Sequence, residues 1–587
     1  MFTQLTPQQR SALRFQEFQQ DSDPDAMRHR REAETEDFRR NRRDTLLQRR
    51  RRATNTDVIE TQPQVNQGEY VITQEEKDTI DELLPLVQNL QSENKEIVLE
   101  NTIKIRKLLS TRNHPPPVQG LTSIDIVTSL VKNLDDDSNT KIQFETEWCL
   151  TNIASGSTAN ARAVAFSGGI EKIIALGYSL DQDVRHQAVW CLGNLAGDSI
   201  DLRKYMLQVG ALEMAIKHVD PSLVDENQQR PNSQQEIIAW AICNFVKNLP
   251  NEERCYQAVL PLCSLLQGKN EGLIREVTHA LSILTEVGIE PQQEVVKSGQ
   301  LRYLIQFGSG KEQKIACSVI KIIGNLISCD DDSVTQAVLD SGGLNMLLSN
   351  LKNTNGTIER ETIWALSNLA AGTQEQVDYM VRQGVAQAMM ENLQTRPCES
   401  KREICWLLMN LSCSDKPFII NSLVEARVLQ ELPIMLRIED TGMRINILNT
   451  ILNILRFIMS NNEESKARLK EYQDQVNQDQ ASDNSFNDQF LINSTDEIKQ
   501  WVGACVNDIC EQYGDREIKK LLTNQAKRIT RRAKLIYNQF ILPFVSQSEE
   551  VQESGPLITD SLGGSTDSSS SLPFHQGATS APDNIWG

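Results

Sequence analysis

A repeated pair of tryptophan and asparagine is the feature of this sequence most capable of chemistry. Five of the seven tryptophans are followed four residues later by asparagine, in the pairs Trp148–Asn152, Trp190–Asn194, Trp240–Asn244, Trp364–Asn368 and Trp406–Asn410. Residues four apart on a helix lie on one face, one turn from each other. Asparagine amides can donate to and accept from the backbone of an extended peptide, and indole faces can hold the stem and charge of lysine or arginine. The pattern therefore predicts a face that binds a short, extended, basic peptide.

The alternative is that these tryptophans are ordinary core residues. That is the usual interpretation of a single tryptophan at helical spacing, but packing alone does not explain a buried asparagine that recurs in every repeat without a partner. Nearby carboxylates fit the binding interpretation, because a basic side chain held along an indole needs an anion at its end. These carboxylates are Asp198, four residues after Asn194, and Glu145, Glu361 and Glu403, each three residues before a tryptophan.

The spacing of the pairs indicates a helical repeat protein. The first three tryptophans are 42 and 50 residues apart, a gap of 124 residues follows, and the last step is again 42 residues. The gap divides into three similar steps if His279 and Lys321 occupy the tryptophan position, and Asn325 follows Lys321 as expected. Apolar residues three and four apart predict helices, and glycines from Gly168 to Gly384 recur with the same period, which predicts turns.

Repeats of roughly 40 to 47 residues built from two or three helices are the HEAT or armadillo class. We therefore predict an all-α, right-handed superhelical armadillo solenoid of about ten repeats. A low aromatic content of 5% agrees with an all-α chain.

Composition excludes several classes of function. No run of eighteen apolar residues and no signal peptide occurs, so neither a membrane span nor secretion is predicted. The twelve cysteines never form C-x-x-C, which predicts buried free thiols in a reducing compartment. Six histidines without clustered ligands, and the absence of a phosphate-binding glycine motif or a nucleophile elbow, predict no enzyme, no metal and no cofactor.

Charge separates a basic arm from an acidic body. The first 52 residues hold 13 Lys or Arg against 9 Asp or Glu and include "RRNRRDTLLQRRRR", although the chain has a formal net charge of −19. Such asymmetry is expected of an interaction tail. The predicted organisation is a basic domain over 1–56, a flexible linker over 57–74, a repeat array over 75–512 with an inserted loop over 473–496, a basic helical extension or cap over 513–545, and a disordered acidic Ser/Gly-rich tail over 546–587.

The sequence resembles importin-α, the armadillo-repeat adaptor of nuclear import. The resemblance rests on the basic arm, the tryptophan–asparagine array and phrases such as "ETEWCLTNIASGS" and "VWCLGNLAGDS". It implies that the groove binds classical nuclear localisation signals, with Asp198 pairing the key lysine. The implied major site is Trp148, Asn152, Gly156, Gln187, Trp190, Asn194, Asp198, Trp240 and Asn244. The implied minor site is Asn325, Glu361, Trp364, Asn368, Glu403, Trp406 and Asn410.

Three positions depart from the family pattern. Ala161 stands where the family usually has a threonine beside the key lysine, so part of the lysine recognition is expected to be lost. The fifth repeat reads His279 and Ile283 in place of the aromatic pair, which is expected to weaken one margin of the major site. Lys321 stands where the family commonly has arginine and keeps a cation between the two sites.

The arm matches the importin-β-binding (IBB) region of the family, and "ALRFQEF" matches its earlier element. The residues implied for importin-β binding and autoinhibition are Arg28, Arg30, Arg31, Arg39, Arg40, Arg42, Arg43, Arg49, Arg50, Arg51 and Arg52. Of these, Arg49 to Arg52 would occupy the chain's own groove when importin-β is absent. A nucleic-acid arm and a solvated helix face remain alternatives, although Glu32, Glu34 and Glu36 reduce the charge of the segment.

The resemblance also implies shuttling between cytoplasm and nucleus, with recycling by a CAS-type exportin and Ran.

The basic segment "GDREIKKLLTNQAKRITRRAKLIYNQFILPF", residues 514–544, predicts a capping helix, a site for a partner or anionic surface, or an imitation of cargo. The competing function is a catenin-like armadillo scaffold for signalling or adhesion, whose groove would be basic.

Overall fold

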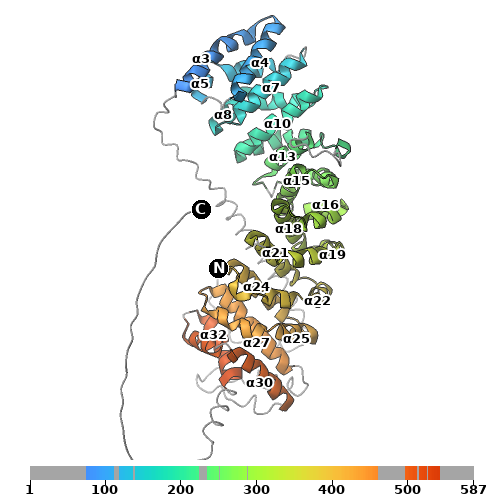
Figure 1. The fold of residues 1–587 in the computed structure, drawn as a ribbon, viewed down its shortest axis with the longest axis vertical. Coiled ribbons are helices and arrows are strands. Elements are labelled where there is room, and N and C mark those ends of the chain that lie inside the picture. The colour runs from blue at the N-terminus through green and yellow to red at the C-terminus, as the bar shows by residue number, and fades with distance from the viewer. Residues whose placement is uncertain are drawn as a thin grey trace, which may run out of the picture.

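The computed structural model describes residues 74–111, 118–135, 139–223, 234–249, 252–286, 288–353, 355–460, 496–511, 514–524 and 526–542. Within these ranges the chain is helical and contains no strand. The helices stack into a long, curved column (Figure 1). The predicted basic domain 1–56 with the eleven arginines implied for importin-β binding, nearly all of the linker, the inserted loop up to residue 495 and the tail 546–587 lie outside the described residues.

Ten helices stack directly on one another along the column, and we call them the third helices because each closes one repeat. They are α4 (Lys95–Thr111), α7 (Thr140–Ala154), α10 (Gln182–Asp198), α13 (Gln234–Val246), α15 (Glu271–Leu284), α18 (Gln313–Ile327), α21 (Gly356–Leu369), α24 (Cys398–Ser412), α27 (Thr441–Ser460) and α32 (Lys527–Ile536). Each packs against the next in this order. This unbroken series brings equivalent positions of successive repeats next to one another.

The other helices complete the repeats. They are α3 (Gln74–Gln88), α5 (Val118–Ser123), α6 (Ile126–Asn133), α8 (Thr158–Val164), α9 (Ile170–Leu176), α11 (Ile200–Gln208), α12 (Ala211–Ile216), α14 (Val259–Ser264), α16 (Ile289–Lys297), α17 (Leu301–Gly308), α19 (Asp332–Asp340), α20 (Gly343–Asn350), α22 (Gln374–Arg382), α23 (Val385–Met390), α25 (Pro417–Glu425), α26 (Val428–Glu431), α30 (Asp496–Glu511) and α31 (Gly514–Lys520). Short 3₁₀ or π segments are Asn89–Gln91, Ala165–Gly169, Pro221–Leu223, Glu253–Ala258, Leu265–Gln267, Leu393–Thr395, Pro433–Arg437, Leu521–Thr523 and Tyr537–Ile541. In Figure 1 the helices α16, α19, α22 and α25 lie on the outer side of the curve, and the third helices beside them lie on its inner side.

The third helices begin at side chains that can cap them. Asn139, Asp181, Asn270, Glu312 and Asn355 each accept a hydrogen bond from a backbone N–H of the first turn of α7, α10, α15, α18 and α21. Such a cap satisfies a donor that has no partner within the helix and typically contributes about 1 kcal/mol. Polar residues at the period of the repeat therefore determine where these helices start.

The recurring glycine turns are confirmed. Gly168, Gly210, Gly299, Gly342 and Gly384 all have positive φ, between 69° and 89°, a conformation that residues with a side chain rarely adopt. In two further repeats the same turn is made without glycine, by Asp125 before α6 and Arg427 before α26. The turn joins the first helix of these repeats to the second.

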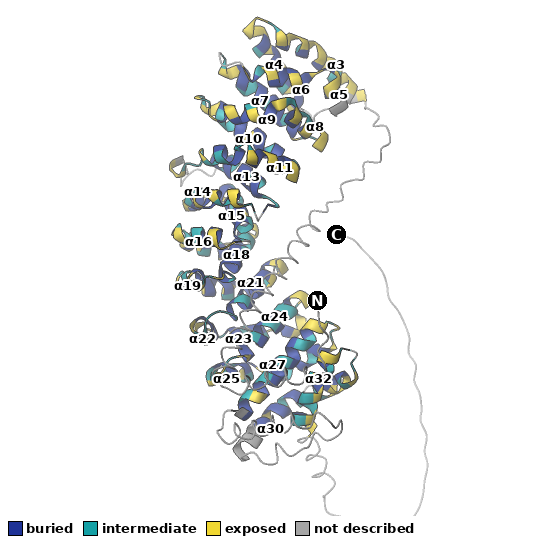
Figure 2. Cartoon of the chain, turned by 180° about the vertical axis from the view of Figure 1, so that it is seen from behind, coloured by how far each residue is buried: buried dark blue, intermediate teal, exposed yellow. Residues whose placement is uncertain are grey.

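One hydrophobic core runs the length of the column, built mainly from buried leucine, isoleucine and valine. Figure 2 shows this buried interior continuing from the first repeats to the last. At the C-terminal end, Ile529, Ala533 and Ile536 of α32 are buried, and Arg532 Nε donates to Asn449 Oδ1 of α27 at 2.5 Å. None of the described helices is both long enough and apolar enough to span a membrane.

Candidate functional site

Seven successive third helices, α7 to α24, carry the residues of the predicted site. The slot positions are Trp148, Trp190, Trp240, His279, Lys321, Trp364 and Trp406, one on each helix. The pair positions, four residues later, are Asn152, Asn194, Asn244, Ile283, Asn325, Asn368 and Asn410. The helices stack in chain order (Figure 1), and equivalent positions on stacked helices form two neighbouring rows along the column.

Five of the six asparagines bond to the helix before their own, and Asn368 Nδ2 is buried without a hydrogen bond to any described residue. The Nδ2 atoms of Asn152, Asn194, Asn244, Asn325 and Asn410 donate to Ser110 Oγ at 2.9 Å, Thr151 O at 3.2 Å, Gly193 O at 3.1 Å, Ser282 O at 3.3 Å and Ser367 O at 3.2 Å. Each bond joins one repeat to the next, so the asparagines have a structural role. The sequence argument that packing does not explain them is therefore wrong.

The same geometry leaves the amide oxygens for a ligand. No described residue donates to the Oδ1 of Asn152, Asn194, Asn244 or Asn410, and all four side chains are partly exposed. An oxygen so placed can accept from the backbone N–H of a peptide without breaking the bond between repeats. Asn325 differs, because it is 3% exposed and donates also to Thr285 Oγ1 at 3.1 Å.

The tryptophans are neither fully exposed nor simply core residues. Trp190 is 38% exposed, Trp364 only 8%, and the other three lie between. Two of them pack against a glycine of the preceding third helix. A Cβ at Gly193 would lie 2.5 Å from Cζ3 of Trp240, and a Cβ at Gly324 would overlap the Trp364 ring. In these two repeats the residue just before the pair position therefore contacts the next slot position.

The first slot already holds a cation from the chain itself. The guanidinium of Arg106 on α4 lies over the Trp148 ring, 4.3 Å from its centroid, and its Nε bonds to Glu145. Arg106 is 42 residues before Trp148, at the equivalent position of the preceding repeat. This contact demonstrates that an indole and a glutamate three residues before it can together hold a guanidinium, the arrangement predicted for a ligand.

The second slot has a carboxylate oxygen that receives no hydrogen bond from the described residues. Asp198 is the last residue of α10, one turn after Asn194, and its Oδ2 is buried without a hydrogen bond from any described residue. The buried Arg203 contributes an electrostatic interaction with Asp198, but its guanidinium Nη1 donates to Ala196 O at 2.6 Å. A buried carboxylate oxygen that lacks a donor is costly, and a cationic ligand would supply one.

Two other predicted residues of the major site have local structural contacts. Gln187 is buried, and its Nε2 donates to Thr151 Oγ1 at 2.7 Å, which joins α10 to α7. Gly156 is partly exposed just beyond α7, and its N–H donates to Ile153 O. Ala161, at the position where the family usually has threonine, is fully buried in α8.

At the predicted minor site the acidic side chains have near neighbours. Glu361 is buried, with Oε1 3.4 Å from Nη2 of the adjacent Arg360. Glu403 Oε2 accepts from Ser367 Oγ at 3.3 Å, across the α21–α24 contact. Glu145, Glu361 and Glu403 are thus all engaged by neighbouring side chains, and Asp198 differs from them in having a buried oxygen without a hydrogen bond from any described residue.

The cysteines are free, as predicted, and most of them are buried, with Cys398 and Cys413 exposed. Burial raises the pKa of Cys191 and of Cys243 to about 12, so both are thiols at neutral pH. Their environment fits packing rather than nucleophilic chemistry.

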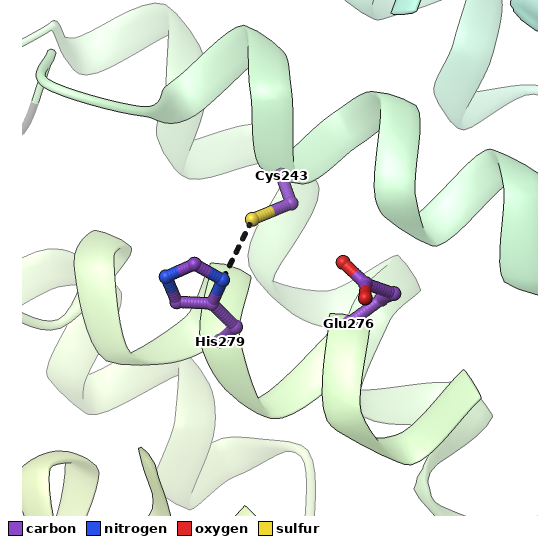
Figure 3. A group of neighbouring side chains, drawn as sticks. All are labelled: Cys243, Glu276 and His279. Carbon is purple, nitrogen blue, oxygen red and sulfur yellow. Dashed lines mark hydrogen bonds between the residues drawn. The ribbon is translucent and has the colours of Figure 1, made fainter. Parts of the chain in front are cut away.

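The sequence did not reveal a group of metal-ligating side chains in the fifth repeat. Cys243 on α13 and Glu276 and His279 on α15 place one ligand atom each within 4.8 Å of the others (Figure 3). The signal was present in part, because Glu276 precedes His279 by three residues, as Glu361 precedes Trp364. Cys243 is 36 residues from His279, and only the stacking of the two helices brings them together.

Two family models match the chain. One is described as an importin beta binding domain and matches residues 14–103, and the other, an armadillo/beta-catenin-like repeat, matches residues 330–371. The second range corresponds to α19, α20 and α21, which form one repeat of the column. The prediction of an armadillo fold is thereby confirmed.

Named relatives agree with both models. The chain is 32% identical to importin subunit alpha-1b of Oryza sativa subsp. japonica over 48% of this chain and 51% of that protein. It is 31% identical to importin subunit alpha-3 of Arabidopsis thaliana over 61% of this chain and 66% of that protein. The chain thus spans about half to two thirds of the length of these two relatives. The crystal structure of an engineered protein shares the fold, with a TM-score of 0.59 and 20% identity over 79% of this chain and 98% of that chain.

Proposed function

From the two family models and the importin-α relatives that the chain resembles, we propose that it is a nuclear import adaptor of the importin-α type. The family consists of transport adaptors rather than enzymes. As an adaptor, the chain would bind lysine- and arginine-rich nuclear localisation signals on the inner face and importin-β through its N-terminal arm. Cargo is thereby joined to the receptor that carries it.

The row of pair positions supports an extended peptide as the ligand. The amide oxygens of Asn152, Asn194 and Asn244 receive no bond from described residues, and successive third helices repeat this acceptor along the column. An extended chain offers its own N–H donors at regular intervals, so both partners satisfy hydrogen bonds without rearrangement. The backbone is held regardless of sequence, and the slots then select basic side chains.

The buried oxygen of Asp198 is the observation that carries the proposal. It lies at the end of α10, beyond the exposed ring of Trp190 and the partly exposed Asn194. A lysine that extends along this face would meet indole, amide and carboxylate in turn, and its ammonium would supply the missing donor. Because Ala161 offers no hydroxyl, the ammonium depends here on Asp198 more than in family members that have threonine at this position.

We assign the second signal site to α18, α21 and α24. There Asn368 and Asn410 would contact the peptide backbone, and Glu361 and Glu403 would approach its basic side chains. This site is expected to be the weaker one, because Trp364 is nearly buried and Glu403 already accepts from Ser367. Lys321 separates the two sites with a positive charge.

The N-terminal arm would serve importin-β and also compete with cargo. A tethered basic peptide meets the inner face at an effective concentration in the mM range, so Arg49 to Arg52 can occupy the major site even with modest affinity. Binding of importin-β to the arm would remove this competitor. As such an adaptor, the chain would shuttle between cytoplasm and nucleus, and a CAS-type exportin with Ran would return it to the cytoplasm.

A titration tests this function. A fluorescently labelled lysine-rich signal peptide is titrated with the full-length chain and with a chain lacking residues 1–70, and anisotropy is measured. Tight binding by the truncated chain and weaker binding by the full chain are expected. Absence of binding by both would refute the adaptor, whereas equal affinities would refute only the competition by the arm. A preference for an acidic control peptide would favour a catenin-like scaffold.

A further inference from the structure

The fifth repeat replaces the aromatic slot with a different set of side chains. Figure 3 shows Cys243 directed from α13 toward the ring of His279 on α15, with the Glu276 carboxylate turned to the same space between the helices. Cys243 Sγ and His279 Nδ1 are 3.5 Å apart, and the carboxylate oxygen lies within 4.8 Å of both. Thiol, imidazole and carboxylate are the ligand types that Zn²⁺ takes in proteins.

The distances fit a tetrahedral ion. Zinc bonds of about 2.3 Å to sulfur and 2.1 Å to nitrogen, at the tetrahedral angle, place these two atoms about 3.6 Å apart. The observed separation of Sγ and Nδ1 already matches this value. The carboxylate needs to move inward by roughly 1 Å, which a rotation of the glutamate side chain provides because the wells of its terminal torsion are broad.

The position of the three residues leaves a fourth coordination site open. Cys243 is buried, Glu276 is partly buried, and His279 reaches the surface of the inner face. A closed structural zinc site would need a fourth protein ligand, whereas this arrangement has three and an accessible side. Water or a side chain of a bound partner can occupy the remaining position.

The surrounding charges are mixed. Burial of the ring, together with the charges of Lys247 and Lys321, lowers the pKa of His279. Glu236 and Arg275 act on Glu276, whose pKa is raised chiefly by burial. A divalent ion bound to thiolate and carboxylate carries no net charge, which limits repulsion from the two lysines.

We propose that Cys243, Glu276 and His279 form a binding site for one divalent transition-metal ion of the Zn²⁺ class, with its fourth coordination position open to the inner face. Binding forms one metal–sulfur, one metal–nitrogen and one metal–oxygen bond. It releases the thiol proton of Cys243 to solvent, together with any proton held by Glu276. The site goes beyond the import function and does not depend on it.

The simpler interpretation is a hydrogen bond between Cys243 and His279 that stabilises the α13–α15 contact. That interpretation predicts no affinity for metals beyond what exposed cysteines and histidines provide. Cobalt distinguishes the two, because Co²⁺ bound tetrahedrally through a thiolate has strong visible bands and a sulfur-to-metal charge-transfer band in the near ultraviolet.

The experiment is a titration of the reduced full-length chain with Co²⁺ in the absence of chelators, followed by addition of Zn²⁺. One equivalent of Co²⁺ should produce both sets of bands, and Zn²⁺ should abolish them. In Cys243→Ser the charge-transfer band should disappear. In His279→Gln the affinity should fall at least 100-fold, since even loss of a group that only supports a ligand costs roughly 10- to 100-fold.

Two control variants address adventitious binding. Cys413→Ser removes an exposed cysteine, and His218→Gln removes a histidine whose Nε2 contacts Gly177 O, away from the cluster. Both should retain the full spectrum. Absence of the bands in the wild-type chain, or their persistence in both cluster variants, would overturn the proposal. Circular dichroism establishes that each variant is folded. Glu276→Gln, which removes the carboxylate on the partly exposed side of the cluster, provides a further variant.

Discussion

Helices α10 and α15 occupy equivalent places in the column but present different chemistry at the same positions. On α10 the slot and pair positions are Trp190 and Asn194, and on α15 they are His279 and Ile283. A second difference separates the α10–α13 contact from the α13–α15 contact. Gly193 makes room for the indole of Trp240, whereas Cys243, at the equivalent position of α13, contacts His279. One scaffold position can therefore hold an indole beside a glycine or an imidazole beside a cysteine.

In these two contacts the slot residue and its neighbour on the preceding helix behave as a unit. The rings of Trp240 and Trp364 fill the volume left by Gly193 and Gly324, because a Cβ at either glycine would overlap the ring. A smaller imidazole leaves room for a thiol. A substitution of the slot residue should therefore alter the stability effect of a substitution of its neighbour. Binding of basic peptides should depend only on the slots that hold a tryptophan.

The largest effect is expected from Trp190→Ala combined with Asn194→Ala. The variant loses a cation–π contact, a backbone hydrogen bond and apolar contact with a lysine stem, about 3 kcal/mol in total, so a signal peptide should bind roughly 100-fold more weakly. Anisotropy with the chain lacking residues 1–70 measures this. The matched variant at α15, His279→Ala with Ile283→Ala, should change affinity less than about threefold. Equal losses in the two variants would contradict the comparison.

The second prediction concerns the volume at Gly193. In Gly193→Ala the new methyl group would meet the Trp240 ring, so the free energy of unfolding should fall by about 1 to 3 kcal/mol. Gly197→Ala on the same helix is the control, because its Cβ would meet only Asn244 Nδ2 at 3.5 Å, and alanine there should stabilise the helix by up to about 1 kcal/mol. Urea denaturation monitored by circular dichroism measures both. A neutral Gly193→Ala would show that the two helices separate easily.

The third prediction tests the open carboxylate. Asp198→Asn keeps the shape but removes the charge, so a charge-assisted bond to lysine becomes a neutral one, and affinity should fall about tenfold. The loss should shrink in a peptide whose key lysine is replaced by alanine. A loss that is the same for both peptides would assign Asp198 to the structure of α10 instead of to the ligand.

The sequence allowed much of this arrangement to be predicted, for reasons that particular residues make clear. The period of the tryptophans predicts the stacking, and the asparagine four residues on predicts the second row, because both depend on local helix geometry. Contacts between repeats could not be obtained in this way. The donation by Asn194 to Thr151 O, the cation of Arg106 over Trp148 and the group around His279 each depend on how one helix lies against the next.

The smallest effect is expected where the comparison is most direct, in converting the α13–α15 contact to the type seen between α10 and α13. His279→Trp alone would force an indole against Cys243, so it should destabilise the chain and tighten peptide binding little. Adding Cys243→Gly supplies the room that Gly193 gives Trp240, and the double variant should recover about 1 kcal/mol of stability relative to the sum of the single changes. Urea denaturation of the four proteins gives this coupling energy, and anisotropy gives the change in affinity, expected to be about two- to fivefold tighter in the double variant. Strictly additive stabilities would mean that residues 243 and 279 do not form a unit, and the equivalence of the two helices would then be limited to their backbones.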